Sequence, residues 1–95
     1  MIKPTVGRVM WYWPFKMEDG GQPYAAIVTR VWGDNMVNLA VFDDGGVLQP
    51  KHSVPIVQDG SPYTAGASPY CEWMPYQLGQ AAKAEALETK LKGAV

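Results

Sequence analysis

The sequence predicts a mainly β protein, a five-stranded SH3-like small barrel followed by a C-terminal α-helix. Short β-rich runs alternate with Gly, Pro, Asn and Asp turns, which is typical of small antiparallel barrels. Beyond Pro75 the prolines stop and strong helix formers dominate. Since 95 residues suffice for one core, we expect the barrel at residues 1–76 and, at 77–95, a helix used for docking or oligomerisation.

The first half of the chain contains the clearest elements. A β-branched and aromatic run at residues 6–13 ends at a proline and predicts the first strand. Residues 16–23 are polar and Gly-rich, which is typical of a flexible loop. Strands at 24–32 and 36–42 then flank a Gly-Asp-Asn turn whose residues tolerate positive φ, so this pair is expected to form a hairpin.

The second half is less regular. After a turn at residues 43–46, a run at 53–57 is interrupted by a proline, so we expect an edge strand with irregular pairing. Residues 58–69 have the composition of an exposed loop, and a short closing strand is expected at 70–74. The helix, predicted over 77–92, carries only a thin apolar stripe, which needs either the barrel or a second copy as a partner surface.

Charge and cysteine content exclude several classes. A net charge of −1 provides no field for extended nucleic acid. The single cysteine, Cys71, cannot form an internal disulfide and is expected to be a small buried residue, so the cytoplasm is the default location. No secretory signal or apolar run of membrane-spanning length is present, which predicts no membrane association.

Period-two alternation divides each strand into two faces, and we expect one face of each to form the core. The expected core residues are Val9, Trp11, Trp13, Ala25, Ile27, Thr29, Val31, Val37, Leu39 and Val41. The opposite faces are too apolar for plain solvated surface, and they carry two arginines. Such a surface predicts either a small-ligand site or a face covered by the helix or a partner subunit.

The candidate ligand-binding residues come mainly from that second surface. Guanidinium groups grip phosphates, and aromatic rings stack on bases. The candidates are Arg8, Tyr12, Arg30, Trp32, Asn38 and His52. For His52 the alternative is an exposed loop residue. One histidine and one cysteine provide no metal cluster, and no catalytic motif occurs, so we predict a non-enzyme without a cofactor.

Residues 3–9, 25–34, 37–42 and 53–55 together resemble a widespread group of small, mostly uncharacterised proteins in tailed-phage and prophage genomes. The resemblance covers about residues 3–57 and Trp73. It implies an SH3-like fold and a viral, intracellular origin, with the host cytoplasm as location. The helix departs from that group, which puts the assembly state in doubt.

Two functions fit this setting best, ahead of a third, direct inhibition of a host defence protein by surface mimicry. The first is an anti-defence sponge, similar in role to phage proteins that sequester a nucleotide-derived immune signal, with Arg8 and Arg30 on phosphates and Tyr12 or Trp32 on a base. Tight binding needs a closed pocket, so we expect a homo-oligomer. The second is a protein-interaction or virion-assembly module, whose aromatic groove would use Trp11, Trp13, Trp73 and residues 63–76.

Overall fold

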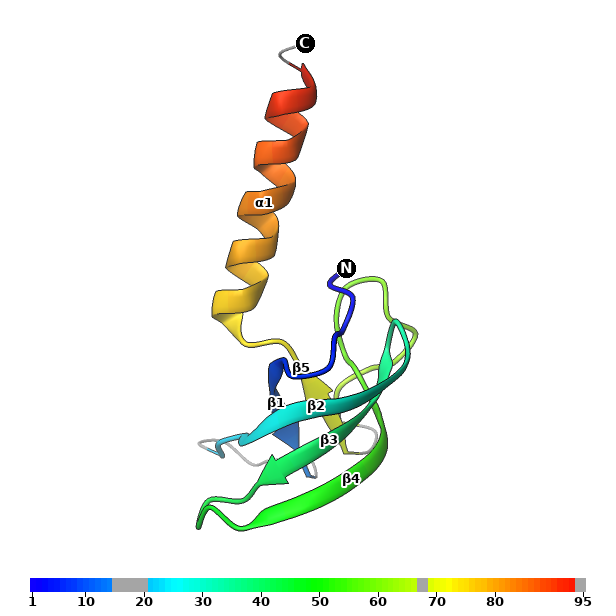
Figure 1. Ribbon diagram of the computed structural model, residues 1–95, viewed down its shortest axis with the longest axis vertical. Coiled ribbons are helices and arrows are strands. Elements are labelled where there is room, and N and C mark those ends of the chain that lie inside the picture. The colour runs from blue at the N-terminus through cyan, green and yellow to red at the C-terminus, as the bar shows by residue number, and fades with distance from the viewer. Residues whose placement is uncertain (15–20, 67–68, 94–95) are drawn as a thin grey trace.

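The chain folds into one curled antiparallel sheet and one helix (Figure 1). A computed structural model describes residues 1–14, 21–66 and 69–93, with the side chains of residues 89 and 91–93 excepted. The elements in chain order are β1 (Val9–Trp13), β2 (Tyr24–Gly33), β3 (Met36–Phe42), β4 (Leu48–Pro55), β5 (Tyr70–Glu72) and α1 (Pro75–Gly93).

The sheet has the strand order β4-β3-β2-β1-β5 and curls into a half-barrel. Its two edges meet where Ile56, just beyond β4, forms a parallel bridge with Cys71 of β5. The Val57 amide also donates a 2.9 Å hydrogen bond to the Cys71 carbonyl. The mainly β small-barrel fold with a C-terminal helix, as predicted from the sequence, is therefore confirmed.

The core lies inside the curl, and its position corrects half of the face assignment. On β3 the predicted residues Val37, Leu39 and Val41 are indeed buried. On β1 and β2 the predicted faces are inverted. The buried residues there are Met10, Tyr12, Ala26 and Val28. Both faces of these strands are apolar, so period two identifies the two faces and does not decide which one points inward.

Two turns and the edge strand follow the predicted pattern with one difference. Residues of positive φ are expected in the first turn, but Asp34 and Asn35 both have negative φ. A bulge at Trp32 allows the chain to turn there. The Asp43 carboxylate accepts hydrogen bonds from the Gly45 and Val47 amides, as expected of an aspartate in a turn. β4 begins five residues before the predicted start, yet it lies at the sheet edge and pairs irregularly, as predicted.

α1 begins two residues earlier than predicted and projects from the barrel (Figure 1). Pro75 occupies the first helical position, where a missing amide hydrogen costs nothing, and the Gln77 side chain accepts a hydrogen bond from the Met74 amide. Gln77 also donates to the Val9 carbonyl, which ties the helix to β1. Leu78 and Leu87 are both exposed and lie on opposite sides of the helix, so the prediction that Leu87 belongs to the same apolar stripe is wrong. Leu78, Ala81 and Ala82 of that stripe do share one side of α1.

Candidate functional site

The most distinctive surface of the molecule is the outer face of the sheet. The register places two adjacent rows of apolar residues across four strands, on the side away from the core. One row is Trp11, Ala25, Phe42 and Leu48, and the other is Val9, Ile27, Ala40 and Pro50. These eight residues are called the apolar outer face below.

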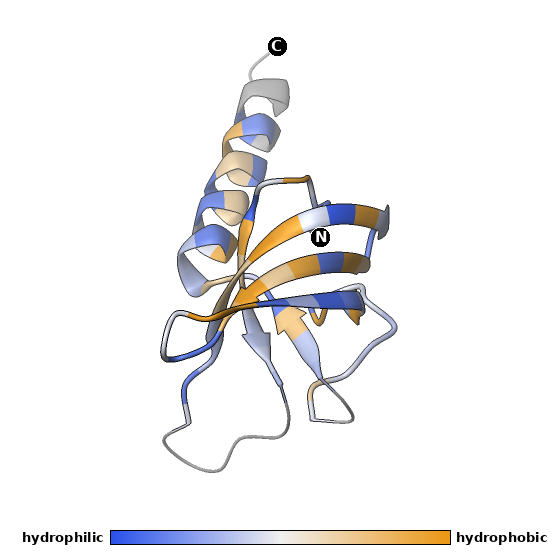
Figure 2. Cartoon of the chain, turned by 60° about the horizontal axis from the view of Figure 1, so that its bottom comes forward, coloured by the Kyte–Doolittle hydropathy of each residue, from blue (hydrophilic) through white to orange (hydrophobic). Residues whose placement is uncertain are grey.

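Five of the eight residues of the apolar outer face are exposed, and Trp11, Ala40 and Phe42 are half-buried. Val9 is 41% exposed, Ile27 37% and Leu48 56%, because α1 leaves the barrel in another direction. Figure 2 shows apolar residues along adjacent strands of the sheet. Soluble monomers rarely expose a contiguous apolar patch of this kind unless it is a contact surface.

One end of this surface carries a fixed tryptophan. The Trp32 side chain is 53% exposed, yet its Nε1 donates a 2.9 Å hydrogen bond to Asn38 Oδ1. The same oxygen accepts a 2.8 Å hydrogen bond from the Ser53 amide. The Arg30 guanidinium carbon lies 4.0 Å from the centroid of the Trp32 ring, a cation–π contact. These contacts involve neither of the two N–H groups of Asn38 Nδ2. They also do not involve the N–H groups of the Arg30 guanidinium.

Three bulges build this cluster. β2 has one extra residue at Thr29 and another at Trp32, and on β4 the pair His52 and Ser53 lies opposite Asn38 alone. The bulge at Thr29 moves Arg30 from the side of Val28 to the side of Asn38, since it changes the alternation by one residue. Ser53 has a φ of 53°, which is strained for a residue with a Cβ. Bulges and strain of this kind concentrate at functional sites.

The sequence-predicted site residues therefore divide into two groups. Arg30, Trp32 and Asn38 lie together, and His52 is exposed in the neighbouring bulge of β4. Tyr12 is 4% exposed and belongs to the core, so its predicted place on the ligand surface is wrong. It pairs with Cys71 of β5, whose small side chain leaves room for the ring inside the barrel.

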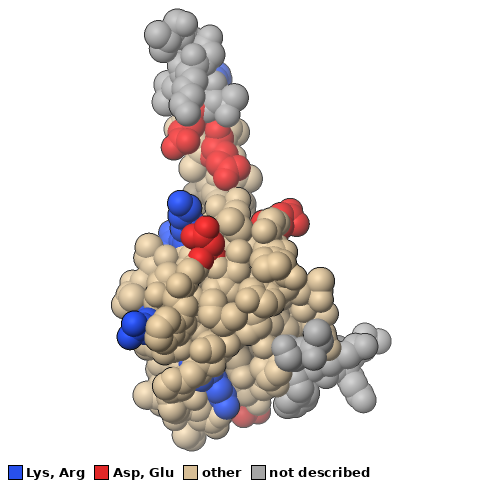
Figure 3. Space-filling model, turned by 90° about the vertical axis from the view of Figure 1, so that its right-hand side faces the viewer, with Lys and Arg blue, Asp and Glu red and all other residues tan. Residues whose placement is uncertain are grey.

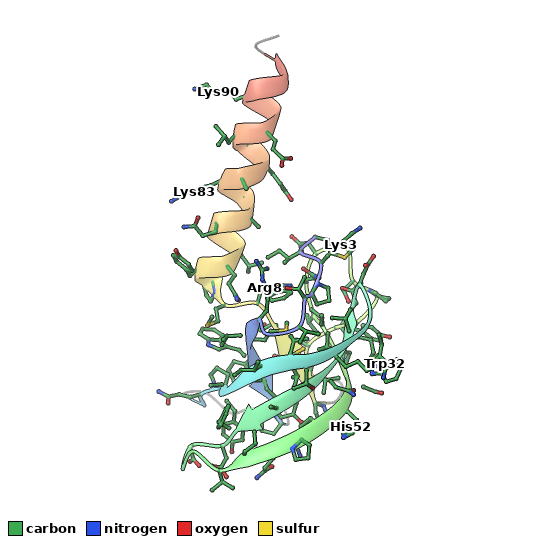
Figure 4. The ribbon with its side chains drawn as sticks, in the orientation of Figure 1. Lys3, Arg8, Trp32, His52, Lys83 and Lys90 are labelled. Atoms are coloured by element: carbon green, nitrogen blue, oxygen red, sulfur yellow. The ribbon has the colours of Figure 1, made fainter. Side chains whose placement is uncertain are left out.

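Arg8 lies apart from the Arg30 cluster. Its guanidinium carbon is 5.5 Å from the centroid of Trp73, near the foot of α1, whereas Trp32 lies on the far side of the barrel (Figure 4). The two arginines therefore do not converge on one phosphate. The loop at residues 16–23, expected to close a pocket, lies mostly outside the described residues.

The predicted aromatic groove is not formed by its three tryptophans. Trp11 belongs to the apolar outer face, Trp13 stacks on Tyr70 at 6.4 Å, and Trp73 is 2% exposed. Trp13 Nε1 donates a 3.1 Å hydrogen bond to Glu72 Oε1, and this bond holds the Trp13 ring where β1 pairs with β5.

Sequence reasoning missed Gln58, which closes one end of the barrel. Its Oε1 accepts hydrogen bonds from the Ile2 amide and from Trp73 Nε1, at 3.0 and 3.1 Å. Its Nε2 donates to the Ile2 carbonyl and to Asn35 Oδ1. An isolated glutamine at the start of a loop provides no sequence pattern for such a role.

Among the described residues, burial is the largest cause of each pKa shift found. Burial raises the pKa of the Cys71 thiol to about 12, with a backbone hydrogen bond opposing this and the nearby Glu72 charge adding to it, which favours the protonated thiol over the reactive thiolate. Burial also raises the pKa of Tyr12, with a smaller contribution from Cys71. Within the described part of the chain, no three His, Cys, Asp or Glu side chains gather to hold a metal ion.

Comparisons with known proteins supply no identity. The chain matches no protein-family model, no curated protein and no solved structure. Among the described residues, no helix has the length and apolarity needed to cross a membrane.

Proposed function

We propose that this protein is a non-enzymatic protein-interaction module that binds a partner through its apolar outer face. The observation that carries the proposal is the pair of apolar rows across β1 to β4, in which five of the eight residues are exposed. Interface centres are apolar and well packed, and aromatic side chains such as Trp11 and Phe42 suit such a centre.

The Trp32 cluster adds an anchor at the rim of this face. Tryptophan and arginine are the residue types most often found at binding hot spots. A side chain that is already held loses little conformational entropy on binding, and Trp32 is held by Asn38 and Arg30 before any partner arrives. The partner expected from these features has an apolar centre flanked by a hydrogen-bond acceptor or acidic group for Arg30.

Site-specific cross-linking tests the proposal. A photoreactive amino acid at Ile27 or Leu48, introduced in cells that make the protein naturally, is expected to trap the same partner from both positions. The matched control is Ala86, which is exposed on α1. Trapping of that partner equally well from Ala86, or of nothing from the two strand positions, would contradict the proposal.

The second candidate is the nucleotide sponge in the host cytoplasm, in keeping with the resemblance to small tailed-phage proteins. It is favoured by one specific feature, the stacked pair of Arg30 and Trp32 beside the free Asn38 amide donors. The free ring face of Trp32 would stack on a base, and the guanidinium edge would bind a phosphate. Because Arg8 and Tyr12 lie elsewhere, this site needs further groups, for which a second copy is the expected source.

Isothermal titration with cyclic di- and trinucleotides and with ADP-ribose derivatives separates the two candidates. A sponge releases heat with one of these ligands, and Trp32→Ala removes that heat while the fold persists. An interaction module shows no heat with any of them and keeps its cross-linked partner.

A further inference from the structure

A concave surface, distinct from the apolar outer face, lies between α1 and the end of the barrel. This cleft has a volume of about 550 Å³, and its apolar lining includes Ile2, Trp73, Leu78 and two alanines of α1. We propose that the cleft binds an apolar helical segment of a partner protein that also carries lysine or arginine side chains. Docking of an amphipathic helix into a groove is a common mode of recognition, and the volume is in the usual range for binding sites.

Hydrogen bonds hold the barrel wall of the cleft and the start of its helix wall before any ligand binds. On the barrel side, Gln58 fixes Ile2 and Trp73 through three hydrogen bonds of 3.0 to 3.1 Å. On the helix side, Gln77 fixes the start of α1 to Met74 and to the Val9 carbonyl at 2.8 and 2.7 Å. Figure 1 shows the helix rising beside the amino-terminal segment with its base at β5. A groove with fixed walls binds at lower entropic cost than one that must form.

The helix wall has the side chains that a docking helix needs. Leu78, Ala81, Ala82 and Glu85 line the cleft at the spacing i, i+3, i+4 and i+7, so they share one face of α1. Leu78 remains 48% exposed although it faces the barrel, so an apolar ligand would remove it from water. The two alanines leave space for a partner helix to approach closely.

Charge decides the chemistry of the occupant. Among the described residues, three carboxylates, those of Asp59, Glu72 and Glu85, line the cleft, and they outnumber the one guanidinium beside it, that of Arg8, which lies 5.5 Å from the centroid of the Trp73 ring. Figure 3 shows acidic side chains both on α1 and on the end of the barrel below it, where basic side chains lie beside them. A basic segment would be attracted by these carboxylates, whereas an acidic one would be repelled.

A second copy of α1 is a poor occupant by the same criteria. Leu78 and Leu87, the exposed leucines among its described side chains, lie on opposite sides of the helix, so these two do not form one apolar ridge to insert. Its described charges are balanced, with Lys83 and Lys90 against Glu85 and Glu88. The inference is therefore independent of the proposed function, which concerns the other surface.

Fluorescence anisotropy with a designed peptide tests the inference. The probe is a labelled amphipathic helix with leucines at i, i+3, i+4 and i+7 and lysines elsewhere, and its twin has glutamate in place of every lysine. The lysine peptide is expected to bind at least about tenfold more tightly than the glutamate twin. Ala81→Trp fills the cleft and is expected to weaken binding of the lysine peptide about tenfold or more. The matched control Ala84→Trp, on another side of α1, is expected to change nothing.

Two further variants keep the outcome decisive. Glu85→Lys changes an exposed side chain without touching the fold, and it is expected to weaken the lysine peptide about fivefold. Ile27→Asp on the apolar outer face is expected to leave the affinity unchanged. Equal binding of both twins, insensitivity to Ala81→Trp and Glu85→Lys, or loss of binding in Ile27→Asp would each overturn the inference.

Discussion

The two faces of the sheet have similar composition and different environments. The inner face carries Met10, Ala26, Val28, Leu39 and Val41, all at most 1% exposed. The outer face, in the alternate positions of the same strands, carries residues that are almost as apolar, and several are more than one-third exposed. The inner rows thus stabilise the fold, whereas exposed outer-row residues such as Val9, Ile27 and Leu48 remain largely in contact with water, and the proposed binding role accounts for their apolar composition.

A pair of truncations tests this division most strongly. Leu39→Ala removes a buried side chain and leaves a cavity, so the free energy of unfolding is expected to fall by about 3 kcal/mol. Ile27→Ala on the outer face is expected to cost less than about 1 kcal/mol. Urea unfolding measures both, and similar losses for the two variants would show that the outer face also forms part of a core.

The division also explains how far the sequence predicts the structure. Strand positions, the hairpin, the irregular edge strand and the helix follow from turn residues and composition. The inward face of β1 and β2 does not, because Val9 to Trp13 and Ala25 to Val28 are apolar on both sides. One clue lies in the closing strand, where Glu72 alternates with Cys71 and Trp73. Because Glu72 is charged, its side of the strand is expected to face outward, and Trp11 lies beside Glu72 on that side.

The candidate site is predictable only in part for a similar reason. Arg30, Trp32 and Asn38 were grouped on a strict period of two, which would have placed Arg30 beside the buried Val28. The bulge at Thr29 brings Arg30 beside Asn38, and no residue type in this part of the sequence predicts that bulge. Gln58 depends on contacts with residues far away in the chain, so local sequence contains no sign of its role.

A substitution of Gln58, which lies at one end of the inner face, also tests the comparison between the two faces. Gln58→Ala leaves the indole Nε1 of Trp73, a 2% exposed residue, without its acceptor, and it releases Ile2. We expect a loss of about 2 kcal/mol in the free energy of unfolding. The exposed Gln49 provides a matched control, since Gln49→Ala is expected to change stability by less than about 0.5 kcal/mol. Equal losses in both variants would remove the special role of Gln58.

A substitution of Asn38 tests whether the Trp32 side chain is held in place at the rim of the outer face. Asn38→Ala removes the acceptor of Trp32 Nε1 and of the Ser53 amide, with an expected cost of about 1 kcal/mol. Nuclear magnetic resonance should show faster solvent exchange of the Trp32 indole hydrogen in this variant. Asn38→Asp keeps an acceptor oxygen and should preserve slow exchange. Unchanged exchange in Asn38→Ala would mean that the cluster does not hold Trp32.

The smallest effect on stability near neutral pH is expected from the thiol of Cys71, on the inner face of the sheet. The pKa of Cys71 is raised from 9.0 to about 12 in the folded protein, so the folded state retains a proton that the unfolded chain loses at lower pH. Its contribution to stability is therefore fully present below pH 9 and is lost as the pH rises from 9 towards 12. Thermal unfolding across this range should show a falling Tm, and Cys71→Ala should reduce the fall. An equal fall in both proteins would contradict this attribution.

The most direct test of the binding role is the double variant Ile27→Asp with Leu48→Asp, assayed for both folding and partner binding. Because both side chains lie in the apolar outer face and outside the core, the variant is expected to unfold cooperatively, with a Tm within a few degrees of the original. Its affinity for the partner trapped at these positions is expected to fall about a hundredfold or more. A folded variant that binds this partner with undiminished affinity would contradict the account.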